Sequence, residues 1–334
     1  MTTSAQIHKL LVSSGAGIFA GALLTWIVGD FNAAYYLVEL MSIGPLEIPF
    51  IVLAAVIVHK FGWQMGIVFT VSGTVVSMSM FVPEVSIASI IYLKTALTGV
   101  IIGEVRWFGS SFTKRLFAAS LPGFILAFVF GMPLIFKGVS PETLEEIKQE
   151  ALEMYQAFMS QDNAKNAVEN AMVMFKFFFQ ASLGIFFISS LVLSWLSFHV
   201  NRWILIKIKE EVEYIPPMYT FTVPFHAIWL FLAGLSLYIF EFKPLFPVTI
   251  NVLFIMAGLY GIQGLAIVMY HMNRIAIGPV PRIFFWLVFF ITITFTIILL
   301  IITGIVDSWI NLRSVPLSSQ NNGHEEENEH ESNT

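Results

Sequence analysis

Long apolar segments occupy most of this chain, and nine of them are about as long as a crossing of a lipid bilayer. An α-helix needs roughly 20 residues to cross ~30 Å of hydrocarbon, where it satisfies its own backbone hydrogen bonds. The sequence therefore predicts an all-α, polytopic transmembrane helix bundle of about nine spans, or eight if the second, shortest segment does not cross. The predicted spans are Leu10–Val28, Gly44–Lys60, Gln64–Val82, Val85–Gly103, Lys114–Phe136, Phe175–His199, Met218–Phe240, Leu245–His271 and Arg282–Val306.

Charged residues are few and unevenly placed. They make up 12 % of the 334 residues, whereas a soluble domain usually carries about a quarter. Lys and Arg are more frequent at the span ends on the same side as the N-terminus, and such ends normally face the cytoplasm. We therefore expect a cytoplasmic N-terminus and, after nine spans, a C-terminus on the outside.

A polar stretch divides the apolar segments into two groups. We expect an N-terminal membrane bundle in residues 1–136, an extramembrane amphipathic helical insert in 137–174, a C-terminal membrane bundle in 175–313 and a disordered acidic tail in 314–334. In the insert, Ser140 followed by Pro141 is typical of a helix start. The apolar residues that then recur at helical spacing are Leu144, Ile147, Ala151, Met154 and Phe158. This helix either caps the outer end of the bundle, offers a partner a docking face or forms a lid over an outer cavity.

Several kinds of chemistry are excluded by what the sequence lacks. The chain has no cysteine, which excludes disulfides, thiolate metal sites and a cysteine nucleophile. It also lacks the G-x-x-x-x-G-K-[ST] phosphate loop and the H-E-x-x-H and G-x-S-x-G catalytic motifs. We therefore expect no enzyme activity, no cofactor, no metal and no nucleic-acid partner, and we expect the lipid bilayer to surround the chain.

Lys94 is the most informative polar residue, because it lies near the middle of a predicted span. A charge at that depth is costly, so it normally faces a cavity or an opposite charge. Lys94 therefore either pairs with an anionic substrate or a buried carboxylate, or it extends its charge to the membrane surface or forms a purely structural ion pair. Glu47 is the predicted partner, because Pro45 and Pro49 break the helix around it, although contact with water also explains a Glu there. Thr98 lies one turn beyond Lys94 on the same face.

Further polar and small residues lie within the spans. His226, Asn251 and Gln263 are candidates for binding a solute, and interhelical hydrogen bonds are the commoner fate of such residues. Glycines let helices approach closely, within the protein or toward a partner. The glycines in question are Gly17 and Gly21, in a G-x-x-x-G pattern, and Gly258, Gly261 and Gly264.

The C-terminal third carries a residue pattern that resembles a known family. The pattern comprises Val212–Pro217, Pro224, Trp229, Asn251, Tyr260–Ala266 and Asp307–Arg313. It resembles the YybS-like integral membrane proteins of bacteria, grouped as domain of unknown function 2232. The resemblance covers roughly Leu10 to Arg313, and both Lys94 and the acidic tail depart from it. It implies the bacterial inner (cytoplasmic) membrane, and a first half similar in fold to the substrate-binding membrane subunits of vitamin importers.

Two functions of different classes fit these observations. One is a small-solute binding or transport component, with the solute near Lys94, Glu47 and Thr98 and with Asn251 and Gln263 from the other half. Since the chain has no nucleotide site, transport would depend on an ion gradient or a separate energising subunit. The other is a non-transporting membrane scaffold for an envelope-associated assembly. A continuous polar cavity around Lys94 favours the first function, and a packed bundle with Lys94 in an ion pair favours the second.

Overall fold

The structure, a computed structural model, describes residues 3–28, 44–80, 85–104, 111–137, 140–212, 214, 216–241, 243–275 and 278–314. Across these ranges it contains α-helices and two short 3-10 helices, and no strand. The predicted all-α fold class is therefore confirmed. The predicted acidic tail lies outside the described residues, apart from Ser314 at its start.

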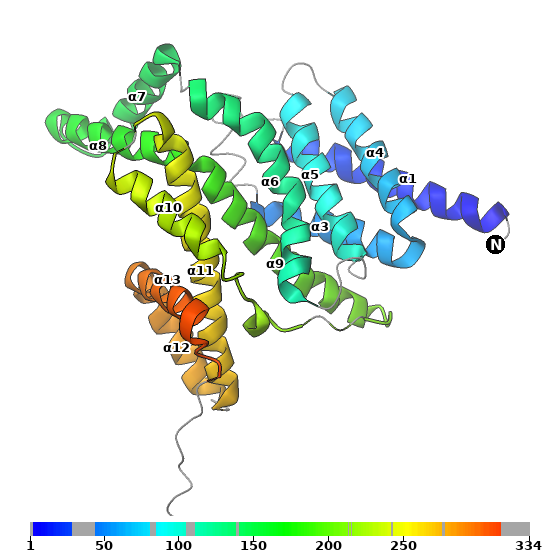
Figure 1. Cartoon of the computed structure of the whole chain (residues 1–334). Coiled ribbons are helices and arrows are strands. Elements are labelled where there is room, and N and C mark those ends of the chain that lie inside the picture. Colours follow the sequence, from blue (N-terminus) through cyan, green and yellow to red (C-terminus); the bar gives the residue numbers. More distant parts are fainter. Residues whose placement is uncertain are drawn as a thin grey trace, which may run out of the picture. The chain divides into compact units, whose positions relative to one another are not determined.

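The chain forms two compact units, one made of Met1–Pro217 with Trp229–Gly258, and the other of Met218–Ile228 with Leu259–Thr334. The first unit contains α1 (Thr3–Val28), α3 (Gly44–Phe61), α4 (Trp63–Met80), α5 (Val85–Gly103), α6 (Phe112–Lys137), α7 (Pro141–Gln156), α8 (Gln161–Gln180), α9 (Ser182–Lys207) and most of α10 (Ala227–Ile239) (Figure 1). The second contains η3 (Met218–Thr220), α12 (Pro279–Ile291) and α13 (Ile293–Ile310). The short η4 (Lys243–Leu245) leads into α11 (Phe246–Arg274), which contributes to both units, so the units differ from the predicted division at residues 137–174.

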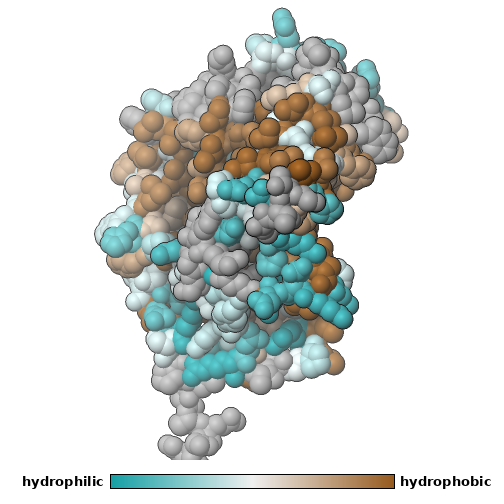
Figure 2. Space-filling view, turned by 90° about the vertical axis from the view of Figure 1, so that its right-hand side faces the viewer, coloured by the Kyte–Doolittle hydropathy of each residue, from teal (hydrophilic) through white to brown (hydrophobic). Residues whose placement is uncertain are grey.

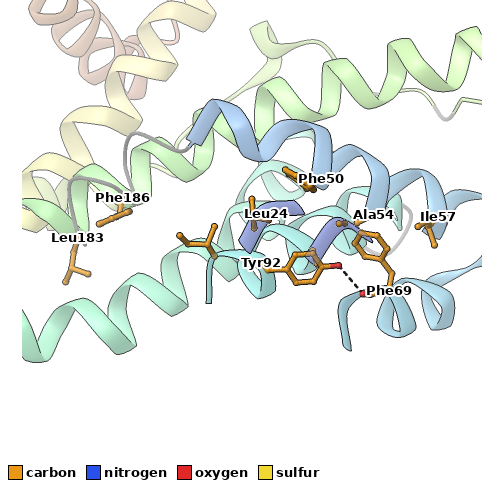
Figure 3. Close-up of a cluster of buried hydrophobic side chains, with 11 residues drawn as sticks. Leu24, Phe50, Ala54, Ile57, Phe69, Tyr92, Leu183 and Phe186 are labelled. Carbon is orange, nitrogen blue, oxygen red and sulfur yellow. Dashed lines mark hydrogen bonds between the residues drawn. The ribbon is translucent and has the colours of Figure 1, made fainter. Parts of the chain in front are cut away.

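The core of the first unit lies among α1, α3, α4, α5 and the start of α9. Tyr92 of α5 is fully buried there, and its hydroxyl donates to the backbone oxygen of Phe69 at 3.1 Å (Figure 3). Gly17 and Gly21 of α1 lie directly against α4, where a Cβ on Gly21 would collide with the backbone oxygen of Gly73. Small residues thus let α1 and α4 approach closely enough to bury this core.

Three of the predicted spans are interrupted in the structure. The segment Phe175–His199 contains the break at Ala181 between α8 and α9, and α9 continues to Lys207. The segment Met218–Phe240 contains only 13 residues of α10, and Arg282–Val306 is divided at Thr292. The Thr292 hydroxyl donates to the backbone oxygen of Val288 at 2.8 Å, a bond that competes with the helix and bends it. A uniformly apolar sequence does not reveal such breaks.

Four described helices are long and apolar enough to cross a membrane by length and composition: Ala5–Leu24, Ser182–Lys207, Phe246–Arg274 and Ile293–Ile310. Ser89–Gly103, Ala227–Ile239 and Pro279–Ile291 are shorter apolar helices. Figure 2 shows apolar side chains covering broad areas of one face, as expected where a surface meets lipid. Large apolar side chains such as Phe284, Phe290 and Phe295 are at least 65 % exposed. The total of nine spans stays a prediction.

The polar insert forms two helices, α7 and α8, where the sequence indicated one amphipathic helix. Ser140 is the N-cap of α7, as predicted, and its hydroxyl accepts from the backbone nitrogen of Thr143 at 3.1 Å. α7 packs against α8, on which Ala164 and Val168 are buried. At the turn between the two helices, Phe158 remains 84 % exposed. The apolar stripe of α7 is therefore covered only in part.

Candidate functional site: two buried polar networks

The first network joins α3 and α5 of the first unit. The ammonium Nζ of Lys94 donates to Oε1 of Glu47 at 2.6 Å, and the hydroxyl of Thr95 donates to Oε2 at 2.8 Å. Glu47 is fully buried, and the Lys94 side chain is 11 % exposed. The predicted pairing of Lys94 with Glu47 is therefore found, and the alternative that Glu47 lies in water at a span end is wrong.

Local sequence explains how Glu47 reaches this position. It lies in the first turn of α3, where the unpaired backbone N–H groups favour a carboxylate and where a preceding proline costs no helical hydrogen bond. The predicted break of the helix at Pro45 and Pro49 is wrong, because α3 is continuous from Gly44 to Phe61 with Pro49 inside it. Gly99 of α5 lies against the backbone oxygen of Ile51 of α3, so the two helices are in close contact at this point. The start of α3 is thus held beside the middle of α5.

Lys94 has hydrogen-bonding capacity beyond this pair. An ammonium group carries three N–H donors. Within the described part of the chain, Glu47 Oε1 is the acceptor found for them. The aliphatic stem of Lys94 passes Gly123 of α6, with its Cδ 3.5 Å from where a Cβ of Gly123 would lie. Thr98, one turn along α5, is 5 % exposed. Two of the three N–H donors of Lys94 thus have no acceptor among the described residues.

The second network joins α11, α13 and the segment before α10, all within the second unit. The amide of Gln263 accepts from the backbone nitrogen of Val223 at 2.8 Å and donates to Oδ2 of Asp307 at 2.8 Å. Oδ1 of Asp307 accepts from the backbone nitrogen of Leu312 at 2.8 Å. Glycines allow this contact, since a Cβ on Gly264 would collide with the backbone oxygen of Leu300. The Gln263 side chain thus connects α11 to α13 and to the segment around Val223.

Arg313 completes the second network. Its Nη2 lies 3.6 Å from Oδ2 of Asp307, and its guanidinium donates to the backbone oxygens of Tyr219 at 3.0 Å and Phe221 at 2.6 Å. Burial lowers the pKa of the Arg313 guanidinium, and the negative charge of Asp307 raises it. Arginine nevertheless keeps its charge in proteins. The charged Arg313 guanidinium therefore acts as a clamp on residues 219–221 through its hydrogen bonds to Tyr219 and Phe221.

The remaining candidate residues have other surroundings. Asn251 accepts from the backbone nitrogen of Gly184 at 2.8 Å and donates to the backbone oxygens of Gln180 and Pro247. It thereby satisfies free backbone groups at the end of α8 and the start of α9. His226 is exposed. Gly258 lies against Ile188, and Gly261 faces Ile301 at 3.6 Å. None of the side-chain hydrogen bonds described for Asn251 and Gln263 goes to Lys94.

Sequence reasoning did not assign roles to Thr95, Asp307 and Arg313. Asp307 and Arg313 did stand in the pattern that carries the family resemblance, together with Gln263, so a signal was present. The signal for Thr95 was only a hydroxyl next to a buried lysine. Among the described residues, no group of three or more His, Cys, Asp or Glu side chains is placed to hold a metal ion.

Comparison with known protein families finds one described as "Predicted membrane protein (DUF2232)", whose pattern matches residues 37–308. The chain belongs to this family. The matched region contains Glu47, Lys94, Gln263 and Asp307 and ends before Arg313. No curated protein and no solved structure matches the chain. Family and helices together describe a multi-pass membrane protein, and the similarity in fold to vitamin-importer subunits stays an expectation.

Proposed function

We propose that this protein is a small-solute binding or transport component of the bacterial inner membrane, without an ATPase of its own. The observation that supports it is the buried ammonium of Lys94, whose three N–H donors have one acceptor, Glu47 Oε1, in the part of the chain that the structure describes. The ion pair by itself is the arrangement expected of the alternative function, a scaffold. Ionisable residues inside membrane helices are rare because they are costly, and they usually serve a pathway or a ligand. In the orientation favoured by the positive residues, the N-terminus is cytoplasmic and the C-terminus outside.

The chemistry of the pair suggests the class of solute. A carboxylate or phosphate group of a small anion offers Lys94 the same acceptor that Glu47 now provides. An anion that replaces Glu47 leaves this carboxylate buried without its cation, which is costly unless it takes up a proton. Because the chain has no nucleotide site, transport would depend on an ion gradient or on a separate energising subunit.

The test is thermal unfolding of the detergent-purified protein with a library of vitamins, nucleobases, amino acids and organic anions. A ligand that binds the native state raises the melting temperature by mass action. We expect an organic anion to stabilise wild type, to stabilise Glu47→Gln more strongly, and to have no effect on Lys94→Met. The matched control is Lys60→Met, which removes a half-exposed lysine paired with Glu210 at 3.3 Å and should keep the response. An anion response that survives in Lys94→Met contradicts the site.

A second candidate function is a non-transporting scaffold for an envelope-associated assembly, and the exposed residues of α7 and α8 favour it. Phe158 is 84 % exposed and Met154 58 % exposed, beside the acidic face of α7. Large apolar side chains exposed on a polar element often mark a contact with another protein. The test is the size of the native complex solubilised from membranes that carry Phe158→Ser. A smaller complex with an unchanged melting temperature supports the scaffold, and an unchanged size contradicts it.

A further inference from the structure

The helix α9 is longer than the hydrocarbon layer is thick. Its 26 residues, Ser182–Lys207, form a helix that is ~39 Å long, about 9 Å more than that layer. The residues directly before it, Phe175–Phe179, are mostly apolar as well, so the excess length lies at the C-terminal end. The last turns of α9 therefore reach the level of the lipid headgroups.

One exposed stripe of α9 extends from the apolar middle of the helix to this end. Its members are spaced by four, three, four and three residues, which places them on one side of the helix. They are Val192, Leu196, His199, Trp203 and Ile206. Since α9 packs against α6 and α3 with its buried residues, the exposed stripe belongs to the lipid-facing surface. Trp203, 61 % exposed, lies where tryptophan is enriched in membrane proteins, at the headgroup level.

Two cations flank the stripe at this level. Arg202 and Lys207 are both exposed, and helical geometry places them on opposite sides of the line through Trp203 and Ile206. The ammonium Nζ of Lys207 lies 5.8 Å from the centre of the Trp203 ring. This cation–π contact holds the ammonium beside the stripe. An apolar track thus ends between two positive charges.

The surrounding charges leave this end positive. In the described part of the chain, neither Arg202 nor Lys207 forms an ion pair, and Glu210 is paired with Lys60 at 3.3 Å. The other charged residues described at the end of α9 are Lys209 and Glu211. Three cations therefore face one unpaired acid, which is the reverse of the acidic α7.

We propose that the end of α9 binds an anionic phospholipid. The phosphate lies between Arg202 and Lys207, and an acyl chain lies along Trp203, Leu196 and Val192. The planar guanidinium of arginine matches a phosphate with two parallel N–H groups, and cations at the membrane surface attract anionic lipid. In the proposed orientation this lipid belongs to the cytoplasmic leaflet. The proposal goes beyond the proposed function, because it requires no solute at Lys94.

The test uses the absence of native cysteine, which allows a fluorophore to be attached at one introduced thiol. The full chain, with the fluorophore at Leu196→Cys, is placed in phosphatidylcholine bilayers. These contain a minor fraction of brominated phosphatidylglycerol or of brominated phosphatidylcholine, and bromine quenches the fluorophore on contact. The matched control position is Val71→Cys on α4, which is 55 % exposed on a helix without charged residues.

We expect brominated phosphatidylglycerol to quench the fluorophore at residue 196 several-fold more effectively than brominated phosphatidylcholine, and the two to quench equally at residue 71. Arg202→Gln and Lys207→Gln should each lower this preference by about fivefold at low salt. The double variant Lys148→Gln, Lys165→Gln, with the same change of net charge on α7 and α8, should keep it.

Equal quenching by the two lipids at residue 196 overturns the proposal, and so does a preference that persists when both Arg202 and Lys207 are replaced. Loss of the preference in millimolar inorganic phosphate also overturns it, because the site then takes the free anion. If the double replacement lowers the melting temperature, Arg202→Gln alone decides, by the same two outcomes. No solute is added, so these results are independent of the site at Lys94.

Discussion

In the first unit a lysine faces a glutamate at 2.6 Å, and in the second an arginine faces an aspartate at 3.6 Å. Asp307 also accepts from Gln263 and from the backbone of Leu312, and Arg313 donates to two backbone oxygens. In the part of the chain that the structure describes, Lys94 donates to Glu47 alone. The Lys94–Glu47 pair is thus the shorter of the two, although Lys94 makes fewer further hydrogen bonds than Arg313.

This difference separates a structural ion pair from one that can change partner. The planar guanidinium of Arg313 is held by several acceptors in fixed directions, and exchanging one of them would disturb the others. The ammonium of Lys94 is compact, sits on a flexible stem and retains donors for another acceptor. We therefore assign the second network to stability and propose the first for binding.

The largest expected effect is in the second network. Asp307→Ala removes the acceptor for Gln263 and leaves the Arg313 charge buried without its partner. Breaking a buried ion pair in this way typically costs about 3–5 kcal/mol. The measurement is the free energy of unfolding in mixed detergent. Thr303→Val, on the same helix, removes a hydroxyl bonded only to its own helix and should change little. Equal losses of unfolding free energy in Asp307→Ala and Thr303→Val would contradict a stabilising role for the second network.

Lys94→Met tests the same comparison in the first unit. We expect a loss at the low end of that range, about 3 kcal/mol, because the stranded Glu47 carboxyl can take up a proton. Adding Glu47→Gln to Lys94→Met should restore part of the stability, with a coupling energy of up to about 3 kcal/mol in a double-mutant cycle. Losses that simply add would show that the two side chains do not interact.

Asn251 extends the comparison of the two ion pairs to a buried polar residue without a charge. Asn251→Ala leaves Gly184 N–H and Gln180 C=O without their partner, which should cost about 1–3 kcal/mol of unfolding free energy. Thr249→Val is the matched control, because the Thr249 hydroxyl is buried and has no hydrogen-bond partner among the described residues. We expect it to be neutral or stabilising. A larger loss in Thr249→Val than in Asn251→Ala would reverse this assignment.

The smallest loss of stability is expected at the exposed start of α7, where water can replace a lost side-chain hydroxyl. Ser140→Ala removes the N-cap of α7, which is worth about 1 kcal/mol. The measurement is hydrogen exchange at the Thr143 amide, which donates to the Ser140 hydroxyl. Ser160→Ala is the control, since Ser160 occupies the same position before α8 without a side-chain cap bond. Similar exchange changes at the starts of both helices would rule out a capping contribution.

Local chemistry made several features predictable. The N-cap at Ser140 and the pairing of Lys94 with Glu47 follow from a helix-start pattern and from the cost of a charge at membrane depth. The family resemblance also contained Gln263, Asp307 and Arg313, although not the contact between them. That contact joins residues 44 positions apart, and no local pattern encodes such a distance.

The sequence by itself determined that this is a helical membrane protein, because long apolar segments leave few other ways to satisfy the backbone in lipid. Its spacing also predicted Lys94 at the middle of a span and Ser140 at a helix start. Only the tertiary structure decided that Asn251 bridges α8 and α9, that Gln263 belongs with Asp307, and that α8 ends at Ala181. A polar group in an apolar helix must find a partner, and the packing of distant helices decides which partner it finds.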